Sequence, residues 1–343
     1  MLQSIWDSIS QHSPRRWLIA SVVPAFVGWT ATAWTYSLWR GIPPTLAAWT
    51  ALQEPERLLL TGASITLVLL TAFALDLLGP TLLLWTAGQW DGLSWWGRRL
   101  QRRARNRQIE QVGPKRRERR GLALRALPPD QVPEPGALIQ EPREPLSADE
   151  EQTYLRLDTE LHEWPAEGQE QATRIGNILR AASEHPLLRY GLDPYVTWPR
   201  LYYLLPEPLR SGLEDARASL EAHVRFACVS VVFTLSWGAL ALANRTVVPT
   251  LATLVGLLTT WLVWRATVQA AAVYGELVRT AYDVHRFALY DALSLPRPHN
   301  SAAEKLAGEE LAAFLWRGSG TRQGGFQWTF KSPPATSEEP KKS

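Results

Sequence analysis

Long apolar runs alternate with strongly polar stretches along this chain of 343 residues, and the apolar runs set its organisation. Residues 226–243 and 247–264 each form a run of 18 residues without a charge, separated only by the polar tip 244–246. Each run is near the lower limit of about 17 residues for a helix that crosses a bilayer. The sequence therefore predicts a membrane-spanning helical hairpin.

The helical pattern continues on the polar side of this hairpin. Leu209, Leu213 and Leu220 keep helical spacing before the first run, and Pro208 suits a first helical turn. After the second run, small and apolar residues recur at alternating threes and fours, which is typical of a helix with a partner helix. These residues are Ala271, Tyr274, Val278, Ala281, His285, Ala288 and Ala292. We expect both helices to leave the membrane and to form a stalk over residues 208–293.

Two more apolar runs precede the hairpin. Residues 17–39 are uncharged, and residues 58–86 contain one ionisable group, Asp76. A loop is expected between them, over 40–57. A cleaved signal peptide is an alternative for the first run, but that run is longer than a signal core, and Pro14 disrupts the pattern of a twin-arginine signal at Arg15 and Arg16. Four membrane spans are predicted in total.

A basic stretch follows the second span. Twelve Lys and Arg residues lie between Arg98 and Arg125 against Glu110 and Glu118, which gives this segment a net charge of +10 in a chain of net charge +3. The positive-inside rule places such a stretch in the cytoplasm, so both termini are expected there. The expected location is the inner (plasma) membrane. An anionic lipid bilayer is the expected partner, contacted by Arg98, Arg99, Arg102 and Arg103. Nucleic acid is the weaker alternative, because no aromatic residue lies between Arg98 and Arg125 to stack on bases.

The polar regions predict helices and one stiff linker. Six prolines lie between residues 127 and 146, which is typical of an extended linker. Ser147 and Glu150 form a capping-box pattern for a helix that ends before Pro165. A second helix is predicted over 171–184, with His185 and Pro186 as its end. A compact aromatic and proline-rich segment follows over 187–207, and an amphipathic helix is expected over 302–316, before a polar tail.

The sequence thus predicts an all-α protein with five parts. They are an N-terminal transmembrane pair (1–97), an arginine-rich juxtamembrane segment with a proline-rich linker (98–146), a cytoplasmic helical domain (147–207), a transmembrane hairpin with its stalk (208–293), and an amphipathic helix with a disordered tail (294–343).

Asp76 and His285 each leave two interpretations open. Asp76 is a functional candidate if it lies near the bilayer midplane, where a charge costs at least about 2.5 kcal/mol, and it is unremarkable if it lies at the interface. His285 could sense pH or bind a metal, but no second His or Cys stands at ligand spacing, so a buried, hydrogen-bonded histidine is favoured.

The richest polar set lies between residues 174 and 200. Guanidinium groups suit phosphorylated or carboxylated ligands, and Pro194 and Pro199 restrict the backbone there, so a ligand or partner pocket is one hypothesis. A rigid plug at the foot of the hairpin is the favoured alternative. The candidate residues are Arg174, Asn177, Arg180, Arg189, Tyr190, Asp193 and Arg200.

No enzyme motif is present in the sequence. We find no phosphate-binding GxxxxGK[ST], no HExxH, no paired CxxC and no GxSxG. The sequence therefore predicts no catalytic residue, no cofactor and no metal site.

Two strings resemble signatures of a family of uncharacterised bacterial multi-pass membrane proteins. They are TRIGNILRAASEHPLLRYGLDPYVTWPRLYYLLPE (173–207) and VYGELVRTAYDVHRFALYDALSLPRP (273–298). The resemblance covers about residues 173–316 and implies a membrane location but no activity.

The functional hypothesis from the sequence is an integral membrane scaffold or signalling component. It would engage an unknown cytoplasmic protein through the stalk domain and would form a homo-oligomer. The alternatives are an oligomeric channel or pore and a membrane-bound enzyme that acts on a phosphorylated ligand.

Overall fold

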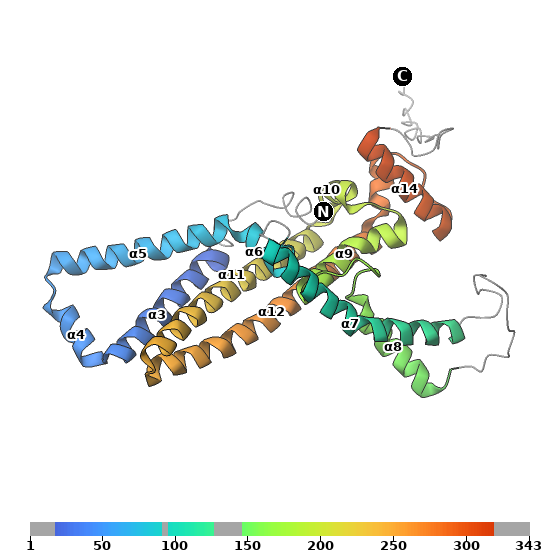
Figure 1. Cartoon of the computed structure of the whole chain (residues 1–343). Helices are drawn as coiled ribbons and strands as arrows, with labels where there is room; N and C mark the ends of the chain where they lie inside the picture. Colours follow the sequence, from blue (N-terminus) through green and yellow to red (C-terminus); the bar gives the residue numbers. More distant parts are fainter. Residues whose placement is uncertain (1–17, 91–94, 127–145, 319–343) are drawn as a thin grey trace, which may run out of the picture. The chain divides into compact units, whose positions relative to one another are not determined.

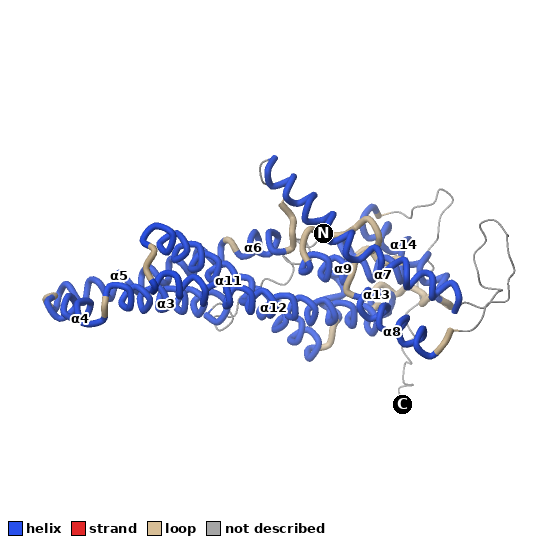
Figure 2. The backbone as a smooth tube through the Cα atoms, turned by 60° about the horizontal axis from the view of Figure 1, so that its bottom comes forward, coloured by secondary structure: helices blue, strands red, loops and turns tan. Residues whose placement is uncertain are grey.

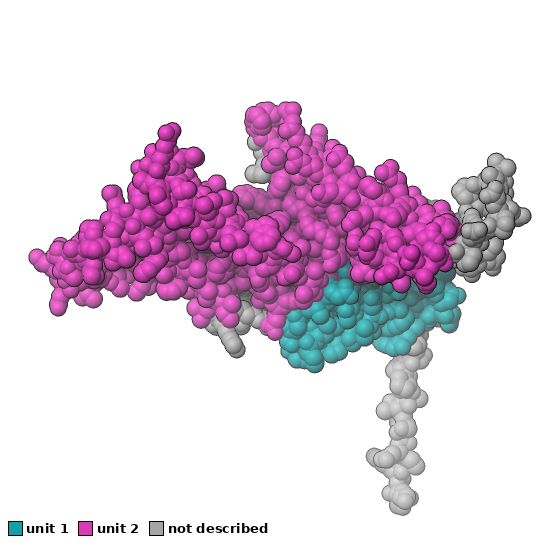
Figure 3. Space-filling model, turned by 90° about the horizontal axis from the view of Figure 1, so that it is seen from below, with its two compact units in different colours: residues 1–10, 182–213, 276–343 teal, residues 11–181, 214–275 magenta. Residues whose placement is uncertain are grey.

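The computed structural model describes residues 18–90, 95–126 and 146–318 (Figure 1). Of these residues, 86% are helical and none is in a strand, which confirms the predicted all-α class. The described residues form two compact units, coloured separately in Figure 3. Unit 1 contains 182–213 and 276–318, and unit 2 contains the rest.

Four helices are long and apolar enough to cross a membrane, as the apolar runs predict. The first is a π-helical turn, η1 (Leu18–Val22), that continues into α3 (Val23–Arg40). The others are α5 (Glu54–Leu77), α11 (Glu207–Asn244) and α12 (Val247–His285). Many of their large apolar side chains are exposed, among them Leu58, Leu70 and Leu254, which is the expected pattern for a surface in contact with lipid. Both long hairpin helices have residues in both units.

The two helices of the hairpin pack closely in unit 2. α11 ends at Asn244 and α12 begins at Val247, so the predicted tip is confirmed, and Arg245 takes the left-handed backbone that the turn needs (φ 49°). Figures 1 and 2 both show the helices side by side. A Cβ on Gly256 would lie 2.5 Å from the Thr234 hydroxyl oxygen. The glycine therefore permits the close approach of the two backbones.

Two predictions for the N-terminal region are wrong in detail. The expected loop 40–57 contains a helix, α4 (Ile42–Ala51), preceded by Gly41 at φ +95°. The expected span 58–86 is divided at Leu78 into α5 and α6 (Gly79–Thr86). Pro80 explains the break, because it has no N–H to donate to the carbonyl of Asp76.

The basic segment is one helix, α7 (Trp95–Ala126), and it packs against α8 (Ala148–His162) in unit 2. Ser147 and Glu150 form the predicted capping box: Glu150 N–H donates to the Ser147 hydroxyl, and Ser147 N–H donates to the Glu150 carboxylate. Most of the proline-rich linker, residues 127–145, lies outside the described residues. The same is true of residues 1–17 and of the tail beyond Gly318.

The helix predicted over 171–184 is longer than expected. α9 (Arg174–Tyr190) passes through His185 and Pro186, so the expected stop is wrong. A proline inside a helix removes the one hydrogen bond to the fourth residue before it, here Ala182, and the turns on either side can persist. The helix ends instead at Gly191, whose φ of +70° favours glycine.

Unit 1 is a small helical domain. Within it, α10 (Pro194–Leu204) occupies the expected irregular segment 187–207, and Asp193 caps it by accepting from Tyr195 N–H. The expected helix through Leu293 is interrupted: α12 ends at His285, and α13 (Phe287–Ala292) follows. At this break the Arg286 guanidinium donates to the carbonyl of Asp283, the group that would accept from the Phe287 N–H in a continuous helix. α14 (Ser301–Arg317) confirms the predicted amphipathic helix.

The core of unit 1 is rich in aromatic side chains. Trp198 of α10 lies at 5.7 Å (ring centroids) from Tyr282, and the Tyr282 hydroxyl is 3.0 Å from that of Thr197. All three residues are fully buried. These contacts hold α10 against the end of α12 and give the domain a defined core.

Candidate functional site

A charged network in unit 2 lies where the uncharged stretches of three helices, η1–α3, α5 and α11, have their ends. Arg225 of α11 donates from Nη2 to the Asp76 carboxylate of α5 (3.0 Å) and from Nη1 to the hydroxyl of Ser21 (3.0 Å). The Ser21 hydroxyl also lies 3.4 Å from Asp76. Glu221, one helical turn before Arg225, lies 3.6 Å from it and also pairs with Arg217 at 3.0 Å. Two arginines therefore share one glutamate, and one of them also holds Asp76.

The sequence explains why these groups meet. Residues 58–75 and 226–243 are both uncharged runs of 18, and Asp76 directly follows the first while Arg225 directly precedes the second. Because the helices run in opposite directions, the two charges lie at the same end. Gly79 makes room for the guanidinium, since a Cβ there would lie 2.9 Å from Nη2 of Arg225.

Sequence reasoning singled out Asp76 but missed its partner. Only 5% of the Arg225 side chain is exposed, so the carboxylate compensates a nearly buried charge. The signal was present in the sequence: a single arginine stands at the polar boundary of an uncharged run, as Asp76 does. The structure thus gives Asp76 a specific partner rather than a free carboxylate.

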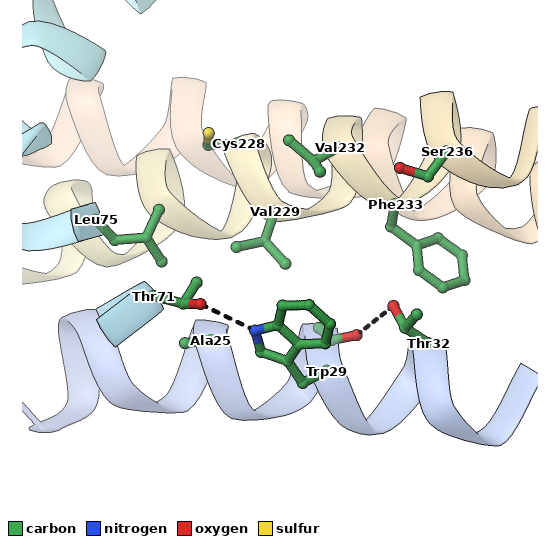
Figure 4. Close-up of a pocket in the computed structure, with 11 residues that line it drawn as sticks. Ala25, Trp29, Thr32, Thr71, Leu75, Cys228, Val229, Val232, Phe233 and Ser236 are labelled. Atoms are coloured by element: carbon green, nitrogen blue, oxygen red, sulfur yellow. Dashed lines mark hydrogen bonds between the residues drawn. The ribbon is translucent and has the colours of Figure 1, made fainter. Parts of the chain in front are cut away.

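An apolar cavity of about 240 Å³ lies between α3, α5 and α11 (Figure 4). Trp29 and Thr32 face Val229 and Phe233 across it. The indole N–H of Trp29 donates to the Thr71 hydroxyl (3.0 Å), and the Thr32 hydroxyl donates to the carbonyl of Gly28 (2.8 Å). The side chains of Trp29, Thr32 and Thr71 are thus engaged within the protein, and the lining is mostly apolar, which suits an apolar chain.

The cations of α7 fall into two halves. Beyond Pro114, the cations other than Arg117 pair with acidic residues of α8 and of the turn after it. The pairs are Lys115–Glu160, Arg116–Glu170, Arg119–Asp158, Arg120–Glu167 and Arg125–Glu150.

The first half of α7 is different. Arg98, Arg99, Arg102 and Arg103, the predicted headgroup contacts, are exposed and have no acidic partner among the described residues. Trp95 and Trp96 precede them and are also exposed. One end of the helix is therefore neutralised by the protein, and the other end carries free positive charge.

The predicted ligand set is divided between the two units. In unit 2, Arg174 pairs with Glu163, Asn177 donates to Gln108 (3.1 Å), and Arg180 donates to Gln169 (2.9 Å). The other members belong to unit 1: Arg189, Tyr190, Asp193, Arg200 and His285. Asp193 and Arg200 make local contacts, since Asp193 caps α10 and Arg200 donates to the carbonyl of Val196 (2.5 Å).

Of the two histidines discussed, His185, which the sequence analysis treated as a helix end, makes a short polar contact, whereas His285 does not. His185 Nε2 lies 2.6 Å from the Asp283 carboxylate, and the Tyr190 hydroxyl donates to the same oxygen (2.6 Å). Burial and this hydrogen bond raise the pKa of Tyr190 to about 12. His285 is half-buried and its imidazole makes no hydrogen bond with the described residues, so the expectation of a buried, hydrogen-bonded His285 is wrong.

A polar cleft of about 580 Å³ lies between α7, α8 and the start of α9, all in unit 2. Two cations and two carboxylates line it, together with amide, hydroxyl and indole groups. The lining residues are Gln108, Gln111, Lys115, Thr159, Glu160, Glu163, Trp164 and Arg174. Arg174 is the member that sequence reasoning had singled out.

These observations define the class of the protein: an all-helical chain with four helices long and apolar enough to cross a membrane. Within the described residues, no three His, Cys, Asp or Glu side chains are grouped to hold a metal ion. Comparison with protein-family models, with curated proteins and with solved structures finds no match. The family resemblance noted above therefore stays a prediction, and the site must be interpreted from its own chemistry.

Proposed function

We propose that this chain is an integral membrane scaffold or signalling component of a bacterial inner membrane. Four helices cross the bilayer, the first half of α7 binds anionic headgroups on the cytoplasmic side, and the helical domain outside the membrane binds a cytoplasmic protein. The observation that carries this proposal is the division of α7 into a neutralised half and a free basic half.

The ion pair between Asp76 and Arg225 supports an assignment of the membrane boundary. Both uncharged runs of 18 residues end at this pair, and a run of that length is close to the minimum for a span. The boundary then falls at the pair, and Asp76 lies at the interface rather than at the midplane. A charged pair costs far less there than in the centre of the bilayer.

The free arginines support the orientation and the lipid contact. α7 begins at Trp95, shortly after α6, and aromatic side chains followed by cations are typical of a helix that lies at the headgroups. Each basic residue near an anionic surface contributes about 1 kcal/mol. Four such residues without acidic neighbours are enough to hold this half of the helix on the bilayer.

Exposed apolar side chains on unit 1 support a protein partner. Leu188, Tyr203, Val284 and Trp316 are each more than half exposed, although they lie outside the uncharged runs. Large apolar groups exposed to water are typical of interaction surfaces. A homo-oligomer is one form that such an interaction would take.

The pore and the enzyme hypotheses have less support. The Asp76 carboxylate is engaged by Arg225 rather than free to line a conduction path, and no three His, Cys, Asp or Glu side chains of the described residues are grouped to hold a catalytic metal ion. Both stay hypotheses without a specific observation in their favour.

The lipid part of the proposal is tested with the full-length protein in a neutral detergent. Short-chain phosphatidylglycerol and phosphatidylcholine are titrated, and binding is measured by thermal stabilisation at low and high salt. We expect stronger stabilisation by the anionic lipid, weakened by salt and by replacement of Arg98, Arg99, Arg102 and Arg103 with Gln.

The matched control replaces Arg117, which is exposed on the other half of the helix and has no acidic partner among the described residues. Equal stabilisation of the fourfold variant and the native protein would reject headgroup binding by this half of α7. Retention of every co-purified protein after deletion of residues 147–207 would reject the partner role of the helical domain.

A further inference from the structure

The polar cleft between α7, α8 and α9 is lined by charged groups of both signs, and one buried donor among them, Nη1 of Arg174, has no acceptor. Nη2 of Arg174 donates to Oε2 of Glu163, but Nη1 is buried and has no hydrogen-bond partner. The guanidinium also stacks on Trp164, 4.7 Å from the ring centroid. A buried donor without an acceptor costs about 1 to 3 kcal/mol, so this atom favours an anionic or carbonyl group in the cleft.

Each of the two carboxylates in the cleft makes its ion pair through only one of its two oxygens. Glu160 accepts from Lys115, and Glu163 accepts from Arg174, in both cases through Oε2. Oε1 of each has no partner among the described residues. These two free acceptors favour a donor with several N–H bonds, and an ammonium group is the strongest such donor.

The side chains that line the cleft have no net charge, and this balance disfavours ligands with a single charge. Lys115 and Arg174 balance Glu160 and Glu163, so a ligand with a single charge would be attracted by one pair and repelled by the other. Burial lowers the pKa of the Arg174 guanidinium, and the nearby carboxylates of Glu163 and Glu160 oppose that shift. A ligand with both charges satisfies every free group at once.

We propose that this cleft binds a small zwitterion, a molecule with an ammonium and a carboxylate or phosphate on one short skeleton. The anionic end accepts from Nη1 of Arg174, and the ammonium end donates to Glu160 and Glu163. Gln108 and Gln111, one helical turn apart on α7, supply amide groups, and Asn177 orients Gln108 through a hydrogen bond of 3.1 Å. The volume of about 580 Å³ is within the usual range for small-ligand sites.

Two sources of this chemistry are distinguished by the probes. Free L-α-amino acids represent a soluble ligand, and glycerophosphoethanolamine represents a lipid headgroup. Each is titrated to about 10 mM against the full-length protein in detergent, by calorimetry and by thermal shift. The matched controls are the decarboxylated amines, the N-acetylated amino acids and glycerophosphate, which keep one charge each.

We expect at least one zwitterion to bind, and its single-charge relatives to bind at least about tenfold more weakly. R174K, which keeps the charge but loses the second donor, and E163Q each weaken binding by about tenfold or more. E167Q, which changes the exposed partner of Arg120 outside the cleft, leaves binding unchanged.

Gln111→Ala tests binding in a variant whose fold should be unaffected. The Gln111 side chain is exposed and makes no hydrogen bond with the described residues. The substitution is expected to weaken binding while the unliganded melting temperature stays the same. The proposal is overturned if no zwitterion binds, if the single-charge relatives bind equally well, or if the cleft variants bind like the native protein. The site does not depend on the scaffold function proposed above.

Discussion

Arg225 of α11 and Asp76 of α5 are 149 positions apart in the sequence and are joined by a hydrogen bond of 3.0 Å. The guanidinium is nearly buried, whereas about a quarter of the Asp76 side chain is exposed. The pair therefore joins two apolar helices, and Glu221, 3.6 Å from Arg225, is a second carboxylate near the same guanidinium.

Asp76→Asn should destabilise the protein, because it leaves the Arg225 charge with Glu221 as its remaining counter-ion. We expect a loss of about 1 to 3 kcal/mol, less than for a fully buried pair because Asp76 is partly exposed. Unfolding in mixed detergent measures it. Glu207→Gln, in the exposed pair with Arg210, is the control and should change stability by less than about 1 kcal/mol. A double variant with Arg225→Gln that loses the full sum of the single effects would show that the two side chains do not interact.

Two neighbouring cations beyond Pro114 in α7, Arg116 and Arg117, should respond differently to replacement. Arg116 pairs with Glu170, whose side chain is only 1% exposed, and also donates to the carbonyl of Pro165 (2.6 Å). Arg116→Ala leaves a buried carboxylate unpaired, and we expect a loss of about 3 kcal/mol. Arg117→Ala, at the next position, is exposed and should be close to neutral. Thermal unfolding compares them, and equal melting temperatures for the two variants would contradict this account of the α7–α8 contact.

Much of the helical architecture could be predicted from the sequence, because uncharged runs and helical spacing report local physics. The hairpin tip, the capping box at Ser147 and the helix at 301–317 follow from neighbouring residues alone. The helix ends at Leu78 and Gly191 were harder to predict from the sequence. Each depends on how one proline or glycine is accommodated by the surrounding packing.

The candidate sites were less predictable, because they depend on contacts between distant segments. Asp76 was identified by its place in an apolar run, but Arg225 became its partner only through the packing of α5 on α11. His285 fitted the helical stripe, yet His185 makes the short contact with Asp283, since α9 continues through Pro186. Pairwise contacts of this kind leave no periodic signal in a single sequence.

Gly308 should not tolerate alanine, although alanine is the better helix former. A Cβ at this position of α14 would lie 2.0 Å from the backbone carbonyl oxygen of Tyr190, so the backbone would have to shift. We expect Gly308→Ala to destabilise unit 1 by about 1 to 3 kcal/mol. Gly212→Ala in α11 is the matched control: no atom lies within 4 Å of the added Cβ, so a gain of up to about 1 kcal/mol is expected. Hydrogen exchange in α14 measures the difference, and similar protection in both variants would refute the close packing of α14 on the end of α9.

Tyr190 should make unit 1 sensitive to alkaline pH. Its ordinary pKa is 10.0, and burial together with the hydrogen bond to Asp283 raises the pKa to about 12 in the folded protein. A raised folded pKa means that the unfolded chain loses the proton first, so the contribution to stability is complete below pH 10 and is lost as the pH rises to about 12. Tyr190→Phe removes this ionisation, and the variant should lose less stability than the native protein between these two pH values. Thermal unfolding from pH 8 to about 12, with ultraviolet titration of the tyrosines, measures both quantities. Parallel stability curves for the two proteins above pH 10 would mean that Tyr190 ionises without an effect on the fold, and that its contact with Asp283 contributes nothing to unit 1.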